Sequence, residues 1–270
     1  MALEGGMAVL EKSLTHGTAE ADMLPECMGT RCESDCLPDR LGTGPESECL
    51  PDMLESRQET ELPAQGAEVQ SEDLAKLDAM LNTPEGIEKL MASHPEKAEL
   101  WRSALEAVEI LNDPDATDAE RRSANGKLSA MQGQLLELSV KDLMAERGLS
   151  VESKQRTVEG EDGGTRPDVI AKNETSAPVS IFEITVMPGE TLSVECKCGG
   201  KTYLSSQLRD HIPNQLSGQI GHKMLLTTGD IQQVDRSLIQ NTCGKYNAKL
   251  LVLGITASDV RNAIKGVSVS

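Results

Sequence analysis

The sequence predicts an α/β domain built around a mixed sheet, preceded by a helical segment and a disordered acidic tail. Two features of the apolar pattern indicate this fold class. From residue 71 to about residue 124, apolar residues recur at spacings of three and four, which is typical of amphipathic helices. From residue 126 onward, helical patterns alternate with short strand patterns, and this order is typical of helices packed on a sheet.

The acidic residues are concentrated in the N-terminal half of the chain, whose formal net charge is −18 overall. Residues 1–70 contain 4 Lys or Arg and 15 Asp or Glu, residues 71–127 contain 7 and 13, and residues 128–270 contain 15 and 16. A non-specific coat on nucleic acid would be basic, so the overall charge argues against that class. Residues 128–270 are nearly neutral, so this part could still bind a phosphate backbone locally. We therefore expect an acidic tail over 1–70, a helical segment over 71–127 and an α/β domain over 128–270.

The tail contains an internal repeat of 13 residues, in which Leu-Pro recurs at positions 24, 37 and 50 and acidic residues follow each time. Because proline interrupts helices and the charge is high, we expect disordered low-complexity sequence. The tail also contains Cys27, Cys32, Cys36 and Cys49. A zinc site is an alternative, but the spacing matches no common zinc knuckle and the repeat itself accounts for two of the cysteines.

The cysteines and the hydropathy pattern indicate in which cellular compartment the protein folds. The chain has seven cysteines, an odd number spread over tail and domain, which gives no disulfide framework and indicates a reducing environment. The first residues lack the basic region and long apolar stretch of a secretory signal, and no apolar run reaches the roughly 18 residues of a membrane span. We expect a soluble cytoplasmic protein with no membrane partner, while export by a system that reads no signal peptide stays open.

The elements of the α/β part follow from local patterns. Helices are expected over residues 127–148, 205–221, 230–243 and 256–266. Strands are expected over residues 149–158, 168–173, 179–186, 191–198, 223–228 and 248–255. The strands over 179–186 and 191–198 are expected to form a hairpin, and residues 159–167 a loop. Pro213 predicts a kink in the second helix, and Thr256 or Ser258 an N-cap for the last.

The stretch SVECKC places an acid and a base side by side. Because side chains alternate along a strand, Glu195 and Lys197 share one face, and Cys196 and Cys198 face the other way, into the core. A carboxylate that holds a divalent cation, beside an ammonium that orients a water or stabilises charge on a phosphate, suits metal-assisted hydrolysis. A hard cation needs more oxygen ligands, and the backbone carbonyl of Cys196 and the carboxylate of Asp168 are candidates.

Two further acids have open roles. Glu137 lies among three leucines in the helix over 127–148, so it either approaches the metal site or points to solvent. Glu183 is an alternative to Glu195, but the residue two positions further on is Thr185 and not a lysine. We expect Glu195 to be the ligand.

Pro167-Asp168 followed by Glu195-x-Lys197 resembles the signature of the PD-(D/E)xK nuclease superfamily. The expected order of elements over roughly residues 128–230 resembles the restriction-endonuclease-like αβββαβ core of that superfamily. The resemblance implies Mg²⁺- or Mn²⁺-dependent hydrolysis of phosphodiester bonds, with Asp168 and Glu195 as metal ligands and Lys197 serving the attacking water. One departure is the 27 positions between the two acids, because many members place the second acid nearer.

The same resemblance implies roles for other residues. Glu137 would be the helical acid of the superfamily, and Gln207 or Gln215 the supporting glutamine, of which we carry Gln215 as the candidate. The GGK stretch at residues 199–201, with these glutamines, also resembles the nuclease domains of bacterial toxins.

Two functions from different classes remain. The first is an endonuclease acting on nucleic acid, with DNA expected before RNA, and the acidic tail engaging a protein partner or inhibitor. The second is an inactive module of the same fold that binds nucleic acid or a protein. The chain's two tyrosines are too few for an aromatic stacking surface. In the nuclease interpretation, the side chains expected on the phosphate backbone are Lys201, Arg209, Lys223 and either Lys154 or Arg156.

Overall fold

The structure, a computed structural model, describes residues 71–153 and 155–267. The acidic tail expected over residues 1–70, with its repeat and its four cysteines, lies outside the described residues, as does Lys154. The described residues all belong to one compact unit, Leu62–Ser270.

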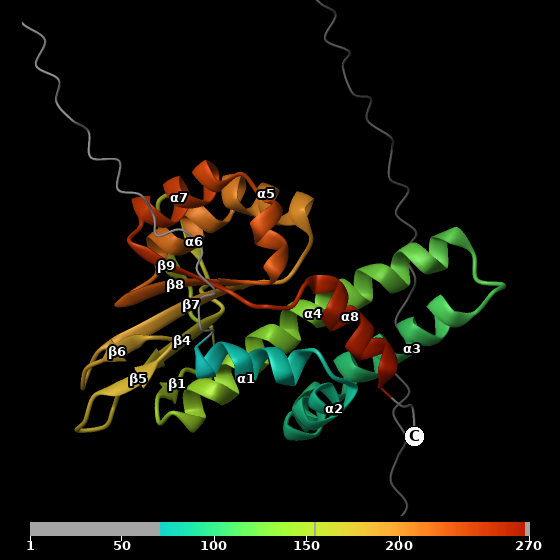
Figure 1. The fold of residues 1–270 in the computed structure, drawn as a ribbon, viewed down its shortest axis with the longest axis horizontal. Coiled ribbons are helices and arrows are strands. Elements are labelled where there is room, and N and C mark those ends of the chain that lie inside the picture. The colour runs from blue at the N-terminus through green and yellow to red at the C-terminus, as the bar shows by residue number, and fades with distance from the viewer. Residues whose placement is uncertain (1–70, 154, 268–270) are drawn as a thin grey trace, which may run out of the picture. The chain divides into compact units, whose positions relative to one another are not determined.

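Eight α-helices and two short 3-10 helices form within the described residues (Figure 1). The α-helices are α1 (Glu72–Leu81), α2 (Pro84–Ser93), α3 (Ala98–Asn112), α4 (Asp118–Glu146), α5 (Lys201–Asp210), α6 (Ile212–Gly218), α7 (Arg236–Lys245) and α8 (Ala257–Gly266). The 3-10 helices are η1 (Pro95–Lys97) and η2 (Gly229–Gln233). Over the described ranges, no helix has the length and apolar character needed to cross a membrane.

Nine strands accompany these helices in the described part. They are β1 (Ser150–Val151), β2 (Val158–Gly160), β3 (Gly163–Thr165), β4 (Val169–Lys172), β5 (Val179–Ile181), β6 (Ile184–Val186), β7 (Thr191–Lys197), β8 (His222–Thr227) and β9 (Ala248–Val252). Five of them form a sheet in the order β1-β4-β7-β8-β9. The pairs β1–β4 and β4–β7 are antiparallel, and β7–β8 and β8–β9 are parallel. The mixed α/β class expected from the sequence is confirmed.

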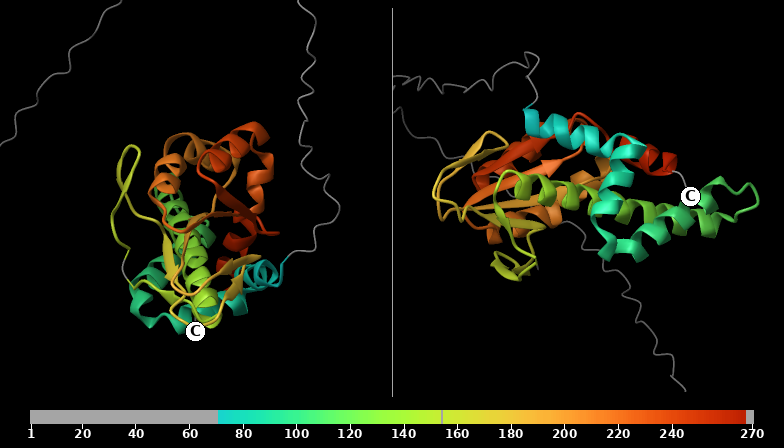
Figure 2. Two further views of the ribbon diagram at one scale, coloured as in Figure 1. Left: turned by 90° about the vertical axis from the view of Figure 1, so that its left-hand side faces the viewer. Right: turned by 90° about the horizontal axis from the view of Figure 1, so that it is seen from below.

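Helix α4 covers one face of the sheet. Val194 and Cys196 of β7 belong to the same buried core cluster as Leu135 and Leu138 of α4. Figures 1 and 2 show the long green helix α4 running along the sheet and past its edge, where α3 and α8 pack on it. The C-terminal end of β7 therefore faces a corner formed by α4 and α8.

Helices α5, α6 and α7 cover the opposite face. Leu225 of β8 forms a second core cluster with Leu204 of α5 and Leu216 of α6. Because side chains alternate along β7, Glu195 and Lys197 project on this second face, opposite to Cys196. Two core layers thus enclose the sheet on both sides.

The helical segment expected over 71–127 does not stand apart from the rest. Helix α4 runs without a break across the expected boundary between residues 127 and 128, because its N-cap is Thr117, whose side chain and that of Glu120 form a capping box. Leu81 of α1 and Trp101 of α3 share one buried cluster with Val194 of the sheet. The helical segment therefore shares the core cluster on the α4 face of the sheet and belongs to the same compact unit.

Residues 179–186 form a small hairpin of their own and do not pair with β7, which corrects the hairpin that the sequence predicts. β5 and β6 pair with each other, with Ile181 opposite Ile184. The turn residues Phe182 and Glu183 have φ angles of 52° and 56°. Positive φ at both positions is the geometry of a two-residue hairpin turn, which sequences usually mark with Asn-Gly. The Phe-Glu sequence of this turn lacks that signal.

Contacts from distant segments hold this turn in place. Phe182 is fully buried, and its N–H donates to Oδ2 of Asp73 at 2.7 Å. Lys249 Nζ donates to the carbonyl oxygen of Phe182 at 2.9 Å. Because α1 and β9 supply these contacts, local sequence could not reveal the turn.

The segment before β4 also differs from expectation. The strand expected over 149–158 is divided, because β1 ends at Val151 and β2 begins at Val158 in a separate hairpin with β3. That hairpin occupies much of the loop expected over 159–167 and packs on α6. The wider sheet is therefore shorter at its β1 edge than the sequence predicts.

Helix boundaries are closer to expectation. The kink expected at Pro213 is a break at His211 between α5 and α6. The helix expected over 230–243 is interrupted, because Asp235 caps a new helix by accepting from the N–H of Ser237 at 2.8 Å. The expected cap of the last helix is Thr256.

Candidate active site

Asp168 and Glu195 meet on neighbouring strands. β4 and β7 pair antiparallel with Val169 opposite Val194, so the next step of the ladder brings Asp168 opposite Glu195. The N–H of Cys196 donates to Oδ2 of Asp168 at 2.8 Å. Hairpin β5–β6 lies between the two acids in the sequence but belongs to another sheet. The long sequence separation therefore leaves the two acids adjacent.

Lys197 joins the two carboxylates. Its Nζ contacts Oε1 of Glu195 and lies 3.8 Å from Oδ2 of Asp168. Burial alone lowers the pKa of Lys197, but the charges of Glu195 and Asp168 outweigh burial, and the pKa lies above its usual 10.5. Lys197 is therefore an ammonium at neutral pH and acts as a hydrogen-bond donor.

Glu195 is enclosed beneath Lys197. Its side chain is 0% exposed, and burial, followed by the nearby charge of Asp168, raises the pKa of Glu195 well above its usual 4.5. Oε2 of Glu195 is buried and accepts no hydrogen bond from any described residue. The same holds for Oγ1 of Thr227, which the β7–β8 register places beside Lys197. Two buried oxygens thus lack the partners that such atoms normally have.

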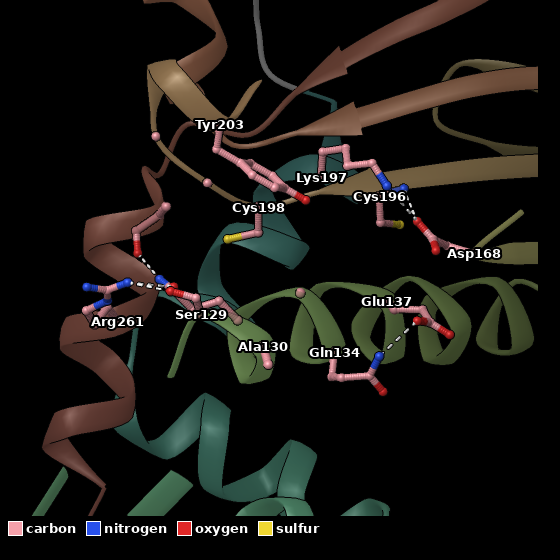
Figure 3. Close-up of a pocket in the computed structure, with 15 residues that line it drawn as sticks. Ser129, Ala130, Gln134, Glu137, Asp168, Cys196, Lys197, Cys198, Tyr203 and Arg261 are labelled. Carbon is pink, nitrogen blue, oxygen red and sulfur yellow. Dashed lines mark hydrogen bonds and ion pairs between the residues drawn. The ribbon is translucent and has the colours of Figure 1, made fainter. Parts of the chain in front are cut away.

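An open pocket of about 490 Å³ lies at the C-terminal end of β7 (Figure 3). Asp168 and Lys197 line it, and Glu195 does not. Helix α4 contributes Glu137 on one side, and Arg261 of α8 lies at the far end from Asp168 in Figure 3. The two catalytic candidates that are accessible therefore open onto one cavity.

Glu137 is mostly buried and lines this pocket, so it does not point freely to solvent. Its carboxylate pairs with Lys141 one helical turn further on, and Gln134 Nε2 donates to its Oε2 at 3.4 Å. Gln155 Nε2 reaches both Oε1 of Glu137, at 3.3 Å, and the carbonyl oxygen of Asp168, at 3.4 Å. Gln155 therefore links the helical acid to the strand acid.

The two cysteines of the strand follow the expected alternation. Cys196 is buried in the core on the α4 face, as predicted, and also borders the pocket, whereas Cys198, expected in the core as well, is half-buried and lines the pocket. Burial raises the pKa of Cys198 to about 12 and that of Cys196 well above its usual range. Both side chains are therefore neutral thiols at physiological pH.

Gln215, Gln207 and Glu183 lie outside this pocket. Gln215 and Gln207 line a separate hollow of about 580 Å³ beside α6, which shares no lining residue with the pocket of Asp168. Helix α6 turns away from α5 at His211, and this break directs Gln215 toward the β2–β3 hairpin. Glu183 is exposed at the tip of β5–β6 and pairs with Lys249 at 3.0 Å. The structure therefore does not bring these residues to Asp168 and Glu195.

The basic residues expected to hold a phosphate backbone are scattered. Lys223 Nζ donates to the carbonyl oxygen of Leu216 at 2.9 Å near the end of α6, so its charge serves that helix terminus. Arg156 pairs with Glu152 at 3.5 Å. Lys201 and Arg209 line a shallow surface hollow on α5. None of these side chains lines the pocket of Asp168.

Sequence reasoning missed Tyr203 and Arg261, which both line the pocket. Arg261 comes from α8, and only the packing of α8 on α4 brings it to the end of β7. Tyr203 lies in the first turn of α5, which directly follows Gly199 and Gly200. Its position so close to the end of β7 was the only hint in the sequence that it could reach the site. Thr227 was missed as well, because nothing in a buried apolar strand marks one hydroxyl.

Comparisons with protein-family models, curated proteins and solved structures give no match for this chain. Within the described ranges, no three or more His, Cys, Asp or Glu side chains form a group that could hold a metal ion by themselves. The chemistry of the site therefore has to be argued from its own geometry.

Proposed function

We propose that this protein is a metal-dependent endonuclease of the PD-(D/E)xK type, with Asp168, Glu195 and Lys197 as its catalytic side chains and DNA as its substrate. The observation that carries the proposal is the placement of Asp168 opposite Glu195, with the ammonium of Lys197 against both carboxylates, beside an open pocket.

The donor atoms fit a hard divalent cation such as Mg²⁺ or Mn²⁺. Oε2 of Glu195 is a buried carboxylate oxygen without a hydrogen-bond partner among the described residues, and such an atom is suited to a cation. The N–H of Cys196 points to Asp168, and the N–H and C=O of one strand residue point to the same side. The carbonyl oxygen of Cys196 would therefore be the third ligand. A cation held there would polarise the scissile phosphate and lower the pKa of a water.

Lys197 supplies a positive charge and a donor. Because the charges of Glu195 and Asp168 raise its pKa, Lys197 carries a proton at neutral pH in the described state. It orients the attacking water and stabilises negative charge on the phosphate. Its ammonium now contacts Oε1 of Glu195 and covers it, so we expect Lys197 to move away from Glu195 when substrate binds.

Glu137 is the proposed helical acid of the site. It lines the pocket and reaches Asp168 through the amide of Gln155. This link holds the loop before β4 against α4 and fixes the direction of the Asp168 strand. Glu137 thus acts as a positioning residue in the proposal.

The order of elements around the acids also supports the proposal. α4, β1, β4, β7, α5 and β8 follow in this order, with hairpins β2–β3 and β5–β6 and helix α6 as additions. Helix, three strands, helix and strand is the order that the nuclease resemblance implies. Asp168 directly precedes the second of these strands, and Lys197 ends the third.

A second candidate is an inactive module that binds nucleic acid or a protein. The full enclosure of Glu195 beneath Lys197 favours it, because a carboxylate that stays covered can hold no cation. The two candidate functions differ in whether Lys197 moves away and exposes Glu195.

Plasmid cleavage tests the proposal. The full chain is incubated with supercoiled plasmid in Mg²⁺ and in EDTA, beside Asp168→Ala and Lys197→Ala. We expect metal-dependent nicking that both variants lose. Intact plasmid and intact RNA with every divalent metal, from a protein that circular dichroism shows to be folded, would support the binding module.

A further inference from the structure

Arg261 is a cation held by neutral groups at the end of the pocket. Its Nη1 donates to Oδ1 of Asn125 at 3.3 Å, and its Nη2 donates to Oγ of Ser129 at 2.9 Å and to Oε1 of Gln132 at 3.3 Å. These acceptors are uncharged side chains of α4, and no carboxylate of a described residue pairs with the guanidinium. Arginine has five N–H donors, so two of them, on Nε and Nη1, donate to no described residue. A fixed guanidinium with spare donors is suited to a phosphate.

Tyr203 presents an aromatic ring to the same pocket. The residue is 44% exposed, although it is one of few aromatic side chains in the protein. Its ring lies directly against Gly199, because a Cβ added to Gly199 would clash with Cδ1 of the ring. A Cβ added to the next residue, Gly200, would meet no atom. Gly199 therefore provides the space that the ring occupies, and the position of the ring is set by the loop after β7.

The size of the pocket limits what it can take. Its volume of about 490 Å³ lies within the roughly 300–1,000 Å³ of sites for one small molecule. That is room for one nucleotide and not for a segment of duplex. A base that is stacked and paired in a duplex cannot enter such a pocket unless it is first unpaired.

We infer that the pocket binds an unpaired nucleotide of the substrate, with its base against the ring of Tyr203 and a phosphate at Arg261. The inference rests on the proposed nuclease function. It adds that single-stranded DNA, or duplex with an unpaired end, is the preferred substrate and continuous duplex is a poorer one. From the sequence alone, two tyrosines are expected to be too few for a stacking surface. A single ring is nevertheless enough to stack on the one base that this pocket would hold.

Binding is measured first, in EDTA, so that metal-dependent cleavage cannot occur. Fluorescence anisotropy of the full chain is recorded with a labelled oligonucleotide of roughly 12 nucleotides, within the usual site size for single strands, and with the blunt duplex of the same sequence. We expect the single strand to bind about tenfold more tightly than the duplex. Tyr203→Leu should weaken single-strand binding by about tenfold, the loss typical of one stacked base, while Tyr203→Phe keeps it.

Matched variants separate the pocket from general effects on folding. Gly199→Ala displaces the ring and should weaken single-strand binding as Tyr203→Leu does, while Gly200→Ala should have no effect. Arg261→Gln should weaken single-strand binding, with Arg261→Lys between it and the unchanged protein. Equal binding of strand and duplex, or binding unaffected by Tyr203→Leu and Arg261→Gln, would overturn the inference.

Cleavage of the same oligonucleotides in Mg²⁺ separates the inference from the proposed function. Metal-dependent cleavage of duplex as fast as single strand, unaffected by Tyr203→Leu, would overturn the inference and leave the nuclease intact. Single-strand binding that depends on Tyr203 and Arg261, without cleavage in any metal, would support the inference about the pocket and contradict the nuclease.

Discussion

Asp168 and Glu195 are adjacent across the β4–β7 pair although 27 positions separate them in the sequence. Residues 173–190, which are hairpin β5–β6 and its two connections, account for 18 of these positions, because the chain leaves the sheet after β4 and returns to it at β7. In the proposed nuclease, the wide spacing of the two acids reflects a hairpin that lies outside their sheet. The two acids keep the relationship that a shared cation would require.

The helices before residue 128 should be needed for folding. Leu81 and Trp101 are buried in the core cluster that includes Val194, and a cut at residue 128 falls inside α4. We expect a fragment of residues 71–270 to unfold in one cooperative transition in urea, followed by far-ultraviolet circular dichroism. A fragment of residues 128–270 should show no such transition, and a cooperative transition there would show that the helices are dispensable.

Asp73 should stabilise the fold from a distance. It accepts from the N–H of Phe182 and pairs with Arg147, while the side chain of Asp73 is only 9% exposed. Asp73→Ala leaves the buried N–H of Phe182 without its acceptor and leaves Arg147 only the exposed Glu72, and we expect the free energy of unfolding to fall by about 3 kcal/mol. Its neighbour Glu72 is exposed and lies 3.6 Å from Arg147. Glu72→Ala is the control and should change the free energy by under about 0.5 kcal/mol, and equal losses in both variants would contradict this account.

Cys198 should react slowly although it lines the pocket. Its pKa is about 12, and only the thiolate is nucleophilic. At pH 8 we expect alkylation by iodoacetamide to be roughly a thousandfold slower than for a thiol of ordinary pKa near 8.5. Peptide mass spectrometry after timed alkylation measures the rate, with the protein in urea as control. The same rate in folded and unfolded protein would show that the thiol is not buried as described.

Stability should depend on pH through Glu195. Because its pKa is raised in the folded state, the contribution of this carboxyl is fully present below about 4.5 and is lost as the pH rises through the folded pKa. Glu195→Gln removes this titration. Lys197 stays charged over the same pH range. The loss of its partner in Glu195→Gln therefore changes the free energy of unfolding by an amount that does not depend on pH.

Urea unfolding of both proteins between pH 5.5 and 8 measures this dependence. The free energy of unfolding of the variant, relative to the unchanged protein, should rise with pH, by at most about 1.4 kcal/mol per pH unit. A difference that stays constant across the range would mean that the folded-state pKa of Glu195 lies below it, which would contradict the raised pKa.

The sequence predicts those parts of the site that one strand or one dipeptide carries. Glu195 and Lys197 share a face because strands alternate, and Asp168 reaches them because it opens the partner strand. The sequence places Glu137 on an apolar helix but leaves open whether its side chain faces the site or solvent. The structure resolves that direction through the contact with Gln155.

The residues that the sequence misplaced depend on packing between distant segments. Gln215 was assigned to the site from its place on a helix after the strand, but the break at His211 directs it elsewhere. Arg261 reaches the pocket only because α8 packs on α4. The turn at Phe182 forms against Asp73 of α1, so its local sequence lacks any turn signal. Each miss is a tertiary contact that no local pattern contains.

Cleavage by Glu195→Gln beside Glu183→Gln tests the central claim most directly. Glu195 lies buried against Lys197 and opposite Asp168, whereas Glu183 is exposed and pairs with Lys249 away from the pocket. The full chain is assayed on plasmid and on single-stranded DNA in Mg²⁺ and in EDTA. The account predicts metal-dependent cleavage that Glu195→Gln abolishes and Glu183→Gln retains. Cleavage that survives Glu195→Gln, or that Glu183→Gln abolishes instead, would contradict it.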